Sequence, residues 1–209
     1  MAMPKNQFAP SRLQLTMIVM ALIAGLAIAG ASYFITRGTQ GPGGTGTALV
    51  GGPFTLTDQN GHKVTEKDFL GRYMLVYFGY TYCPDVCPTE LQVISAALEQ
   101  MGTKAADIQP IFITVDPQRD TPSILKQYVS NFHSRLIGLT GTSEEIAAVA
   151  KVYRVYYSKM DSKNAADQYL MDHTSIIYLM NRQGMFLKHF TYSTDSTELA
   201  RALEKAMSL

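Results

Sequence analysis

The chain has only two cysteines, Cys83 and Cys87, and they stand four residues apart beside Pro84 and Pro88. The apolar run before them, residues 74–78, is rich in β-favouring side chains and bounded by glycines, which predicts a buried strand. A cysteine thiolate, rather than the thiol, acts as nucleophile and as metal ligand. The segment therefore predicts a site for sulfur chemistry or for the binding of a soft metal ion.

An amphipathic helix is predicted directly after the cysteines. Thr89 and Gln92 match the pattern of a capping box, and Pro88 suits the start of a helix. The apolar residues that recur there at steps of three and four are Leu91, Ile94, Leu98 and Met101. Both thiols should therefore lie at or just before a helix N-terminus, where unpaired N–H groups and the helix dipole favour the thiolate.

Four uses of the cysteine pair are open from the residues alone. The thiols could be buried and inert, although structural thiols seldom stand together at a helix start beside prolines. They could form a dithiol/disulfide oxidoreductase, or a peroxidase in which Thr81 lies near Cys83. They could also bind a metal ion. Two thiolates are too few for tetrahedral zinc, whereas two thiolates and one imidazole suit Cu(I).

The third ligand of such a copper site would come from one of four histidines, His62, His133, His173 and His189. We interpret His62 as following a hairpin turn, His133 as ending a helix and His189 as alternating along a strand, so each has a solvated or packing role. His173 instead closes a polar segment just before an apolar run. It is therefore the candidate ligand, and the alternative for it is a solvent-facing loop histidine.

The overall composition limits the classes of function. The 209 residues include 18 basic and 17 acidic side chains, a formal net charge of +1, which gives no support for nucleic-acid binding. Two cysteines cannot build a disulfide scaffold. The length suits one compact domain with appendages.

The N-terminal part predicts a membrane anchor. Residues 13–36 contain no charged side chain, a run longer than the roughly 20 residues that span a bilayer. Lys5 and Arg12 precede the run and Arg37 follows it, so the positive-inside rule places residues 1–12 in the cytoplasm. The alternative is a cleaved signal peptide. Because the N-terminus lacks the character of a transit peptide, we expect a bacterial inner membrane, a single-pass anchor and a periplasmic domain.

The rest of the chain predicts an α/β domain. A flexible Gly-rich linker covers residues 37–49, and the folded domain occupies residues 50–209. Asn60 and Gly61 mark a hairpin between residues 54–57 and 63–64. Thr65, Thr121 and Thr142 are predicted helix caps. Further core strands are predicted at residues 111–115 and 175–180, and residues 185–190 are predicted to return as the antiparallel partner of the latter. A loop is predicted at 159–172, and a closing helix carries Leu199, Leu203 and Ala206 on its inner side. This order indicates a central sheet with helices on both faces.

Three stretches in the same order resemble the SCO/SenC family of copper-binding assembly factors. They are residues 77–88 (YFGYTYCPDVCP), 112–122 (FITVDPQRDTP) and 169–175 (YLMDHTS). The resemblance extends from about residue 51 to the C-terminus, and the predicted single anchor and linker fit it. It implies a thioredoxin-like fold with an extra N-terminal β-hairpin.

The resemblance also implies a ligand set and a role. Cys83, Cys87 and His173 would bind one copper ion per chain, as Cu(I) or Cu(II). The family serves maturation of the dinuclear copper centre in subunit II of cytochrome c oxidase, by delivering copper, by reducing that subunit's cysteines, or both. Such a role requires an upstream copper donor and a thiol reductant. A membrane-anchored thiol-disulfide oxidoreductase and a copper- or redox-sensing module remain the alternatives.

Two departures from ordinary thioredoxins weaken a general oxidoreductase role. The cysteines are spaced C-x-x-x-C rather than C-x-x-C, and His173 stands where a thioredoxin would carry its cis-proline. Asp172 could orient the His173 ring, attract a partner or simply be solvated. Three residues of the loop after the second core strand, Asp116, Arg119 and Asp120, are expected near the site or in a loop-stabilising ion pair.

Overall fold

The computed structural model describes residues 17, 20, 22–26, 49–160 and 169–208, which fall in two compact units, Met1–Ala48 and Leu49–Leu209. Residues 22–26 of the first unit are helical. No helix among the described residues is long and apolar enough to cross a membrane. The predicted segment 1–12 and most of the predicted anchor 13–36 and linker 37–49 lie outside the described residues, so they remain predictions.

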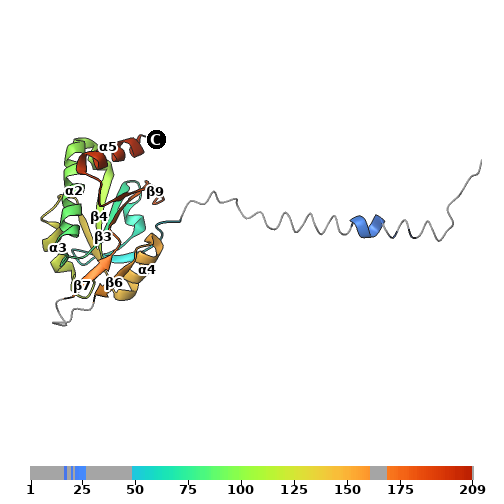
Figure 1. The fold of residues 1–209 in the computed structure, drawn as a ribbon, viewed down its shortest axis with the longest axis horizontal. Helices are drawn as coiled ribbons and strands as arrows, with labels where there is room; N and C mark the ends of the chain where they lie inside the picture. The colour runs from blue at the N-terminus through green and yellow to red at the C-terminus, as the bar shows by residue number, and fades with distance from the viewer. Residues whose placement is uncertain (1–16, 18–19, 21, 27–48, 161–168, 209) are drawn as a thin grey trace, which may run out of the picture. The chain divides into compact units, whose positions relative to one another are not determined.

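A seven-stranded sheet forms the centre of the second unit (Figure 1). In spatial order its strands are β2 (Lys63–Thr65), β1 (Thr55–Asp58), β5 (Ile137–Thr140), β4 (Ile108–Thr114), β3 (Tyr73–Gly79), β8 (Ile176–Met180) and β9 (Phe186–Thr191). The strand β3, which leads to the cysteines, runs parallel to β4 and antiparallel to β8. β1 and β2 form the predicted N-terminal hairpin.

Helices cover both faces of this sheet, as predicted (Figure 1). On one face lie α2 (Val86–Met101), α3 (Pro122–Val129) and α5 (Ser196–Met207), and on the other lies α4 (Ser143–Tyr153). Short 3-10 helices are η1 (Glu66–Phe69) and η2 (Gly102–Asp107). The predicted caps at Thr65, Thr121 and Thr142 are confirmed.

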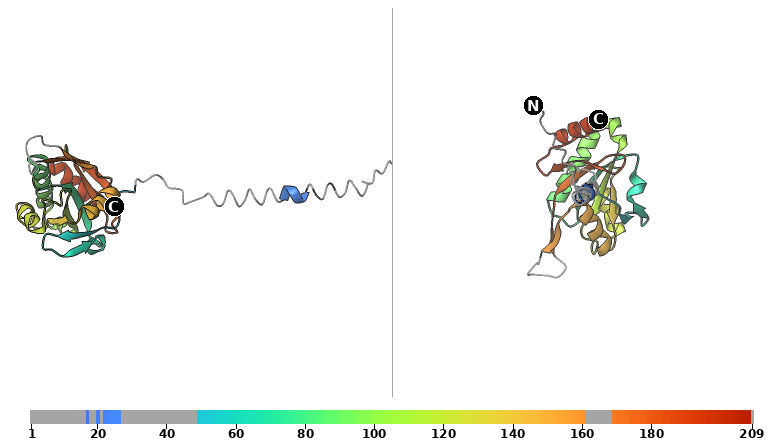
Figure 2. Two further views of the ribbon diagram at one scale, coloured as in Figure 1. Left: turned by 90° about the horizontal axis from the view of Figure 1, so that it is seen from below. Right: turned by 90° about the vertical axis from the view of Figure 1, so that its right-hand side faces the viewer.

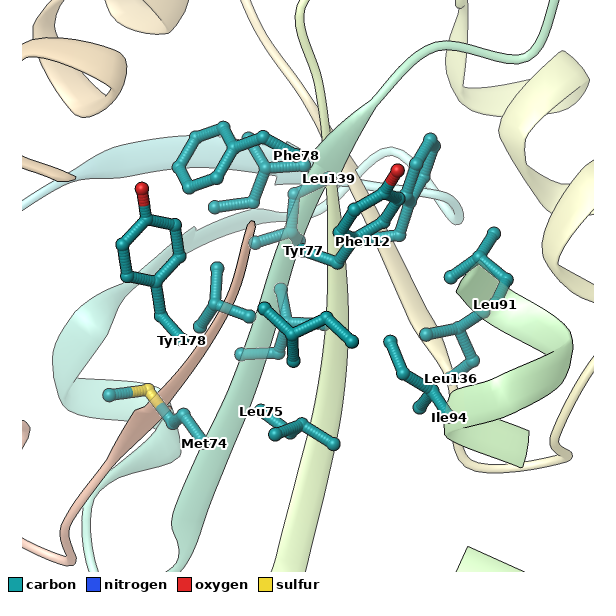
Figure 3. Close-up of a cluster of buried hydrophobic side chains, with 14 of the residues drawn as sticks. Met74, Leu75, Tyr77, Phe78, Leu91, Ile94, Phe112, Leu136, Leu139 and Tyr178 are labelled. Carbon is teal, nitrogen blue, oxygen red and sulfur yellow. The ribbon is translucent and has the colours of Figure 1, made fainter. Parts of the chain in front are cut away.

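The two faces of β3 supply the centre of the core. Leu75 points toward Leu91 and Ile94 of α2, whereas Phe78 lies on the opposite side with Tyr178 (Figure 3). The Phe78 and Tyr178 rings meet edge to face with centroids 6.2 Å apart. Side chains on both faces of β3 are buried, which explains why this strand is a continuous apolar run rather than an alternating one.

The predicted cap at Thr89 is wrong. α2 begins at Val86 with Asp85 as its N-cap residue, and the Thr89 hydroxyl donates to the Asp85 carbonyl at 2.9 Å. Pro88 permits this earlier start, because the first four N–H groups of a helix have no intrahelical acceptor and a proline there loses no bond. The shift places Cys87 inside the first turn of the helix.

The predicted loop at residues 159–172 is also wrong in part. β6 (Tyr157–Met160) and β7 (Leu170–His173) pair as a two-stranded antiparallel sheet, here called the ribbon, which extends from the body of the domain (Figure 2). Residues 161–168 lie outside the described part of the chain. Because the ribbon is half exposed and polar, it lacks the apolar periodicity by which a strand is recognised.

Candidate metal centre

The loop after β3 and the first turn of α2 hold the two sulfur atoms. Between them runs the cysteine loop, residues 80–85, which contains Cys83. Cys87 is completely buried and Cys83 is half-buried, and both are free thiols. The backbone N–H of Cys87 donates to Cys83 Sγ at 3.3 Å. A free N–H group of the first helical turn thus faces a sulfur atom, as expected for a site that stabilises a thiolate.

His173 reaches the sulfurs from the last position of β7. Its Nε2 lies 3.4 Å from Cys87 Sγ, and its Nδ1 lies 3.2 Å from the Thr174 carbonyl oxygen. Because a carbonyl only accepts hydrogen bonds, Nδ1 carries a proton, and in the neutral ring the lone pair of Nε2 faces the sulfurs. The candidate ligand atoms of Cys83, Cys87 and His173 all lie within 4.8 Å of one another. The fold therefore brings the three predicted residues together.

Gly79 makes room for the buried sulfur. A Cβ atom built on Gly79 would lie 2.8 Å from Cys87 Sγ and 2.8 Å from Phe112 Cε2. Such distances are well inside van der Waals contact, so any side chain here would displace Cys87 or Phe112. The glycine between strand and cysteine loop is thus a steric requirement of the site.

Two tyrosines flank the imidazole. The Tyr80 and His173 rings meet edge to face at 5.8 Å between centroids, and Tyr77 approaches the same ring at 6.5 Å. The Tyr77 hydroxyl lies 3.2 Å from Ser175 Oγ, just beyond β7. These contacts hold the ring in a mostly apolar setting and limit the access of water to Nε2.

Asp120 fastens the cysteine loop to the sheet. Its carboxylate accepts hydrogen bonds from the Thr81 N–H at 3.0 Å, the Thr81 hydroxyl at 2.5 Å and the Thr114 hydroxyl at 2.5 Å. Asp120 is completely buried, and this burial raises its pKa. Of the two alternatives for the loop after β4, Asp116 and Arg119 form the ion pair, at 2.5 Å, whereas Asp120 supports the site.

The remaining predicted polar residues lie apart from the sulfurs. Asp172 is exposed on the ribbon, and the His173 ring is oriented by the Thr174 carbonyl instead. His62 pairs with Asp58, His133 Nδ1 accepts from the Arg135 N–H, and His189 stacks on Phe186. Within the described ranges, Cys83, Cys87 and His173 form the only cluster of metal-binding type.

The pKa values of the two thiols are shifted in opposite directions. A hydrogen bond with the Cys87 thiol is the largest cause that holds the pKa of Cys83 well below its usual range, and contacts with His173 and the Cys87 N–H add to it. The same hydrogen bond, followed by burial, raises the pKa of Cys87. In the reduced, metal-free protein Cys83 is therefore the thiolate near neutral pH.

Iodoacetamide is expected to alkylate Cys83 first, at a rate that hardly changes between pH 8 and pH 6. An ordinary thiol with a pKa of about 8.5 would slow roughly 75-fold over that range, because its thiolate fraction falls. The measurement is mass spectrometry of the reduced, metal-free chain after timed alkylation. In Cys83→Ser the remaining thiol should react slowly at both pH values. A Cys83 rate that falls in parallel with that of free cysteine would contradict the assignment.

The chain matches one known protein family over most of its length. The family model described as SCO1/SenC matches residues 42–208. The human protein described as "Protein SCO1 homolog, mitochondrial" is 43% identical over 164 residues, which cover 78% of this chain and 54% of the human protein. The chain thus spans about half the length of that curated relative.

Solved structures extend the comparison to the fold. The structure described as Bradyrhizobium japonicum ScoI with copper bound is 49% identical, with a TM-score of 0.69, and the match covers 75% of this chain and 99% of that one. A structure at 25% identity and a TM-score of 0.60, covering 77% and 95%, is described as BsSco with a disulfide switch, a member of the Sco family of cytochrome c oxidase assembly proteins. These likenesses confirm the predicted thioredoxin-like α/β fold.

Proposed function

Because the chain belongs to the SCO1/SenC family, we propose that it binds copper through Cys83, Cys87 and His173 and acts in cytochrome c oxidase assembly. The single observation that carries this proposal is the convergence of two sulfurs and one imidazole nitrogen within 4.8 Å. The likeness to a copper-bound relative and to a protein described as an oxidase assembly factor supports it.

The donor set suits copper better than the common alternatives. Soft thiolates and a neutral imidazole favour Cu(I), which accepts low coordination numbers, while structural zinc takes four protein ligands. Cys87 is buried, but Cys83 and His173 are half exposed, so a bound ion is reached from one side. A ligand from an acceptor protein can enter on that side and take the ion by exchange. Copper is thus the cargo of the site, at one ion per chain.

The proposed acceptor is the dinuclear copper centre in subunit II of cytochrome c oxidase. Since thiolates bind copper and a disulfide does not, oxidation of Cys83 and Cys87 would empty the site. A periplasmic thiol reductant must therefore keep the pair reduced, and an upstream donor must load it. We place the domain in the periplasm, held at the bacterial inner membrane by a single helix over residues 13–36.

A second candidate function uses the same sulfurs without the metal. Cys83 and Cys87 are both free, their sulfur atoms lie within 4.8 Å, and the pKa of Cys83 is lowered by the hydrogen bond with Cys87. A pair of this kind suits a thiol-disulfide reductase that reduces the cysteines of the oxidase subunit. Such a reductase requires both thiols, whereas copper delivery requires the imidazole as well.

Deletion of the gene is expected to lower cytochrome c oxidase activity, and added copper is expected to restore part of it. The decisive strain carries His173→Ala in the chromosomal copy, with oxidase activity and oxidase copper content as the measurements. Copper delivery predicts that this strain resembles the deletion, because the ion loses a ligand. Reduction of the subunit predicts near wild-type activity in His173→Ala and an activity as low as that of the deletion strain in Cys87→Ser. A sensing module predicts that the oxidase keeps its copper in every strain.

A further inference from the structure

A tyrosine at the outer end of the ribbon, just before β7, is held by a charged pair on the loop after β4. Arg119 donates through NH1 to the Tyr169 carbonyl oxygen at 2.9 Å, and its guanidinium carbon lies 3.7 Å from the centroid of the Tyr169 ring. The Tyr169 hydroxyl donates to Asp116 Oδ1 at 2.7 Å, and Asp116 Oδ2 accepts from Arg119 Nε. We call these three residues, Asp116, Arg119 and Tyr169, the tyrosine clamp.

The clamp contacts both of the chain segments that carry the candidate metal ligands. The Arg119 guanidinium also lies 4.6 Å from the centroid of the Tyr82 ring, next to Cys83 in the cysteine loop. Tyr169 directly precedes β7, the strand that ends at His173. One guanidinium thus contacts the segment that carries the sulfurs and the segment that carries the imidazole.

We propose that the tyrosine clamp sets the distance between His173 and the two sulfurs, with Arg119 as the positioning residue. The part of its test that measures copper binding rests on the proposed function. An isolated two-stranded sheet is only marginally stable in water, so the ribbon depends on contacts with the body of the domain. β7 is four residues long and forms a continuous extended strand, so a shift at its start is transmitted to His173 at its end.

The clamp requires arginine rather than any cation. A guanidinium is planar, stacks on an aromatic ring and donates in several directions at once, whereas an ammonium is a compact, strongly hydrated charge. In Arg119→Lys one amine cannot reach Asp116, the Tyr169 carbonyl and the ring faces together. Burial of the Tyr169 hydroxyl raises its pKa to about 12, so the phenol stays protonated and keeps donating to Asp116.

In the full chain, Arg119→Lys is expected to weaken Cu(II) binding on the order of 10- to 100-fold, as loss of a residue that orients a ligand does. The thiolate-to-copper charge-transfer absorption, which we expect His173→Ala to abolish, should weaken in Arg119→Lys. Cu(I) affinity should fall much less because both thiolates remain. Tyr169→Phe, which removes only one hydrogen bond, should give a smaller change in the same direction. If Arg119→Lys does not fold, Tyr169→Phe is used in its place to test the clamp.

A matched control lies at the far end of β8. Arg182 donates to the Gly71 carbonyl at 2.9 Å and to Asp107 at 2.8 Å, and its guanidinium lies 5.2 Å from the Tyr73 ring centroid. Arg182→Lys thus removes the same kinds of contact without touching the ribbon. Copper binding should be unchanged in this variant.

Hydrogen exchange of the reduced, metal-free chain gives a readout that does not depend on copper. Amides of residues 170–173 should exchange on the order of 10-fold faster in Arg119→Lys than in wild type or Arg182→Lys, because the ribbon loses its outer attachment. Unchanged exchange and an unchanged Cu(II) spectrum in Arg119→Lys would overturn the clamp. If His173→Ala itself leaves the Cu(II) spectrum unchanged, the proposed ligand set fails, and faster exchange in Arg119→Lys would still support the clamp as a structural device.

Discussion

Replacing Cys87 by serine is expected to reduce the copper content of the purified, reduced chain from one ion to none. Serine keeps the shape of the side chain but offers a hydroxyl that stays protonated at neutral pH and is a hard ligand, so the soft ion loses its buried donor. Cys83→Ser should have the same effect, because a single thiolate and an imidazole leave Cu(I) exposed to any competing thiol. The measurement is copper per chain after dialysis against a Cu(I) chelator.

Two controls separate ligand loss from damage to the fold. Cys87 is completely buried, so Cys87→Ser leaves a hydroxyl in an apolar site and costs roughly 1–3 kcal/mol of stability. Cys83 is half-buried, and Cys83→Ser should melt close to wild type while still losing copper. His189→Ala removes a histidine that stacks on Phe186 away from the sulfurs, and it should bind copper normally. A single serine variant that retains one tightly bound ion would refute the two-thiolate site.

The strand and the helix that flank the two cysteines could be predicted from the sequence. β3 is buried on both faces and therefore appears as an unbroken apolar run, and α2 repeats its apolar residues at helical spacing. Thr121 and Thr142 accept from backbone N–H groups three residues later, which is the local chemistry that their sequence pattern predicts. These features depend on neighbours within a few residues, so no knowledge of tertiary structure was needed.

Elements that depend on partners distant in the sequence could not be predicted from it. β5 contains only four residues, and a Cβ on Gly138 would lie 3.0 Å from Val129 of α3, so the strand owes its glycine to close helix packing. The ribbon is polar and half exposed, and it is a sheet only because β6 and β7 pair with each other. His173 was predicted beside the cysteines from its position before a core strand, but its place on a strand was not.

The supporting role of Asp120 at the site could not be predicted from the sequence either. In the sequence it is one acidic residue in a polar loop, with no local pattern to distinguish it from Asp116. Its two hydrogen bonds to Thr81 join residues 39 positions apart, and Thr81 lies in the cysteine loop. Only the parallel pairing of β3 with β4 brings the two loops to the same edge of the sheet.

Asp120→Ala is accordingly expected to destabilise the domain by about 3 kcal/mol. The variant leaves the partly buried N–H of Thr81 without an acceptor, removes the partner of two hydroxyls and opens a small cavity. For a domain of this size that loss corresponds to a fall in melting temperature of roughly 6–12 °C. Urea denaturation of the reduced, metal-free chain, followed by circular dichroism, gives the free energy of unfolding.

The matched control is Asp107→Ala, which breaks the ion pair of Arg182 with a carboxylate that is 53% exposed. Exposed pairs contribute at most about 1 kcal/mol, so this variant should unfold close to wild type. If Asp120→Ala is no more destabilising than Asp107→Ala, the carboxylate does not fasten the cysteine loop. If it is, faster alkylation of Cys87 at urea concentrations well below the unfolding midpoint should accompany the loss, because the loop over the buried sulfur is released before the sheet unfolds.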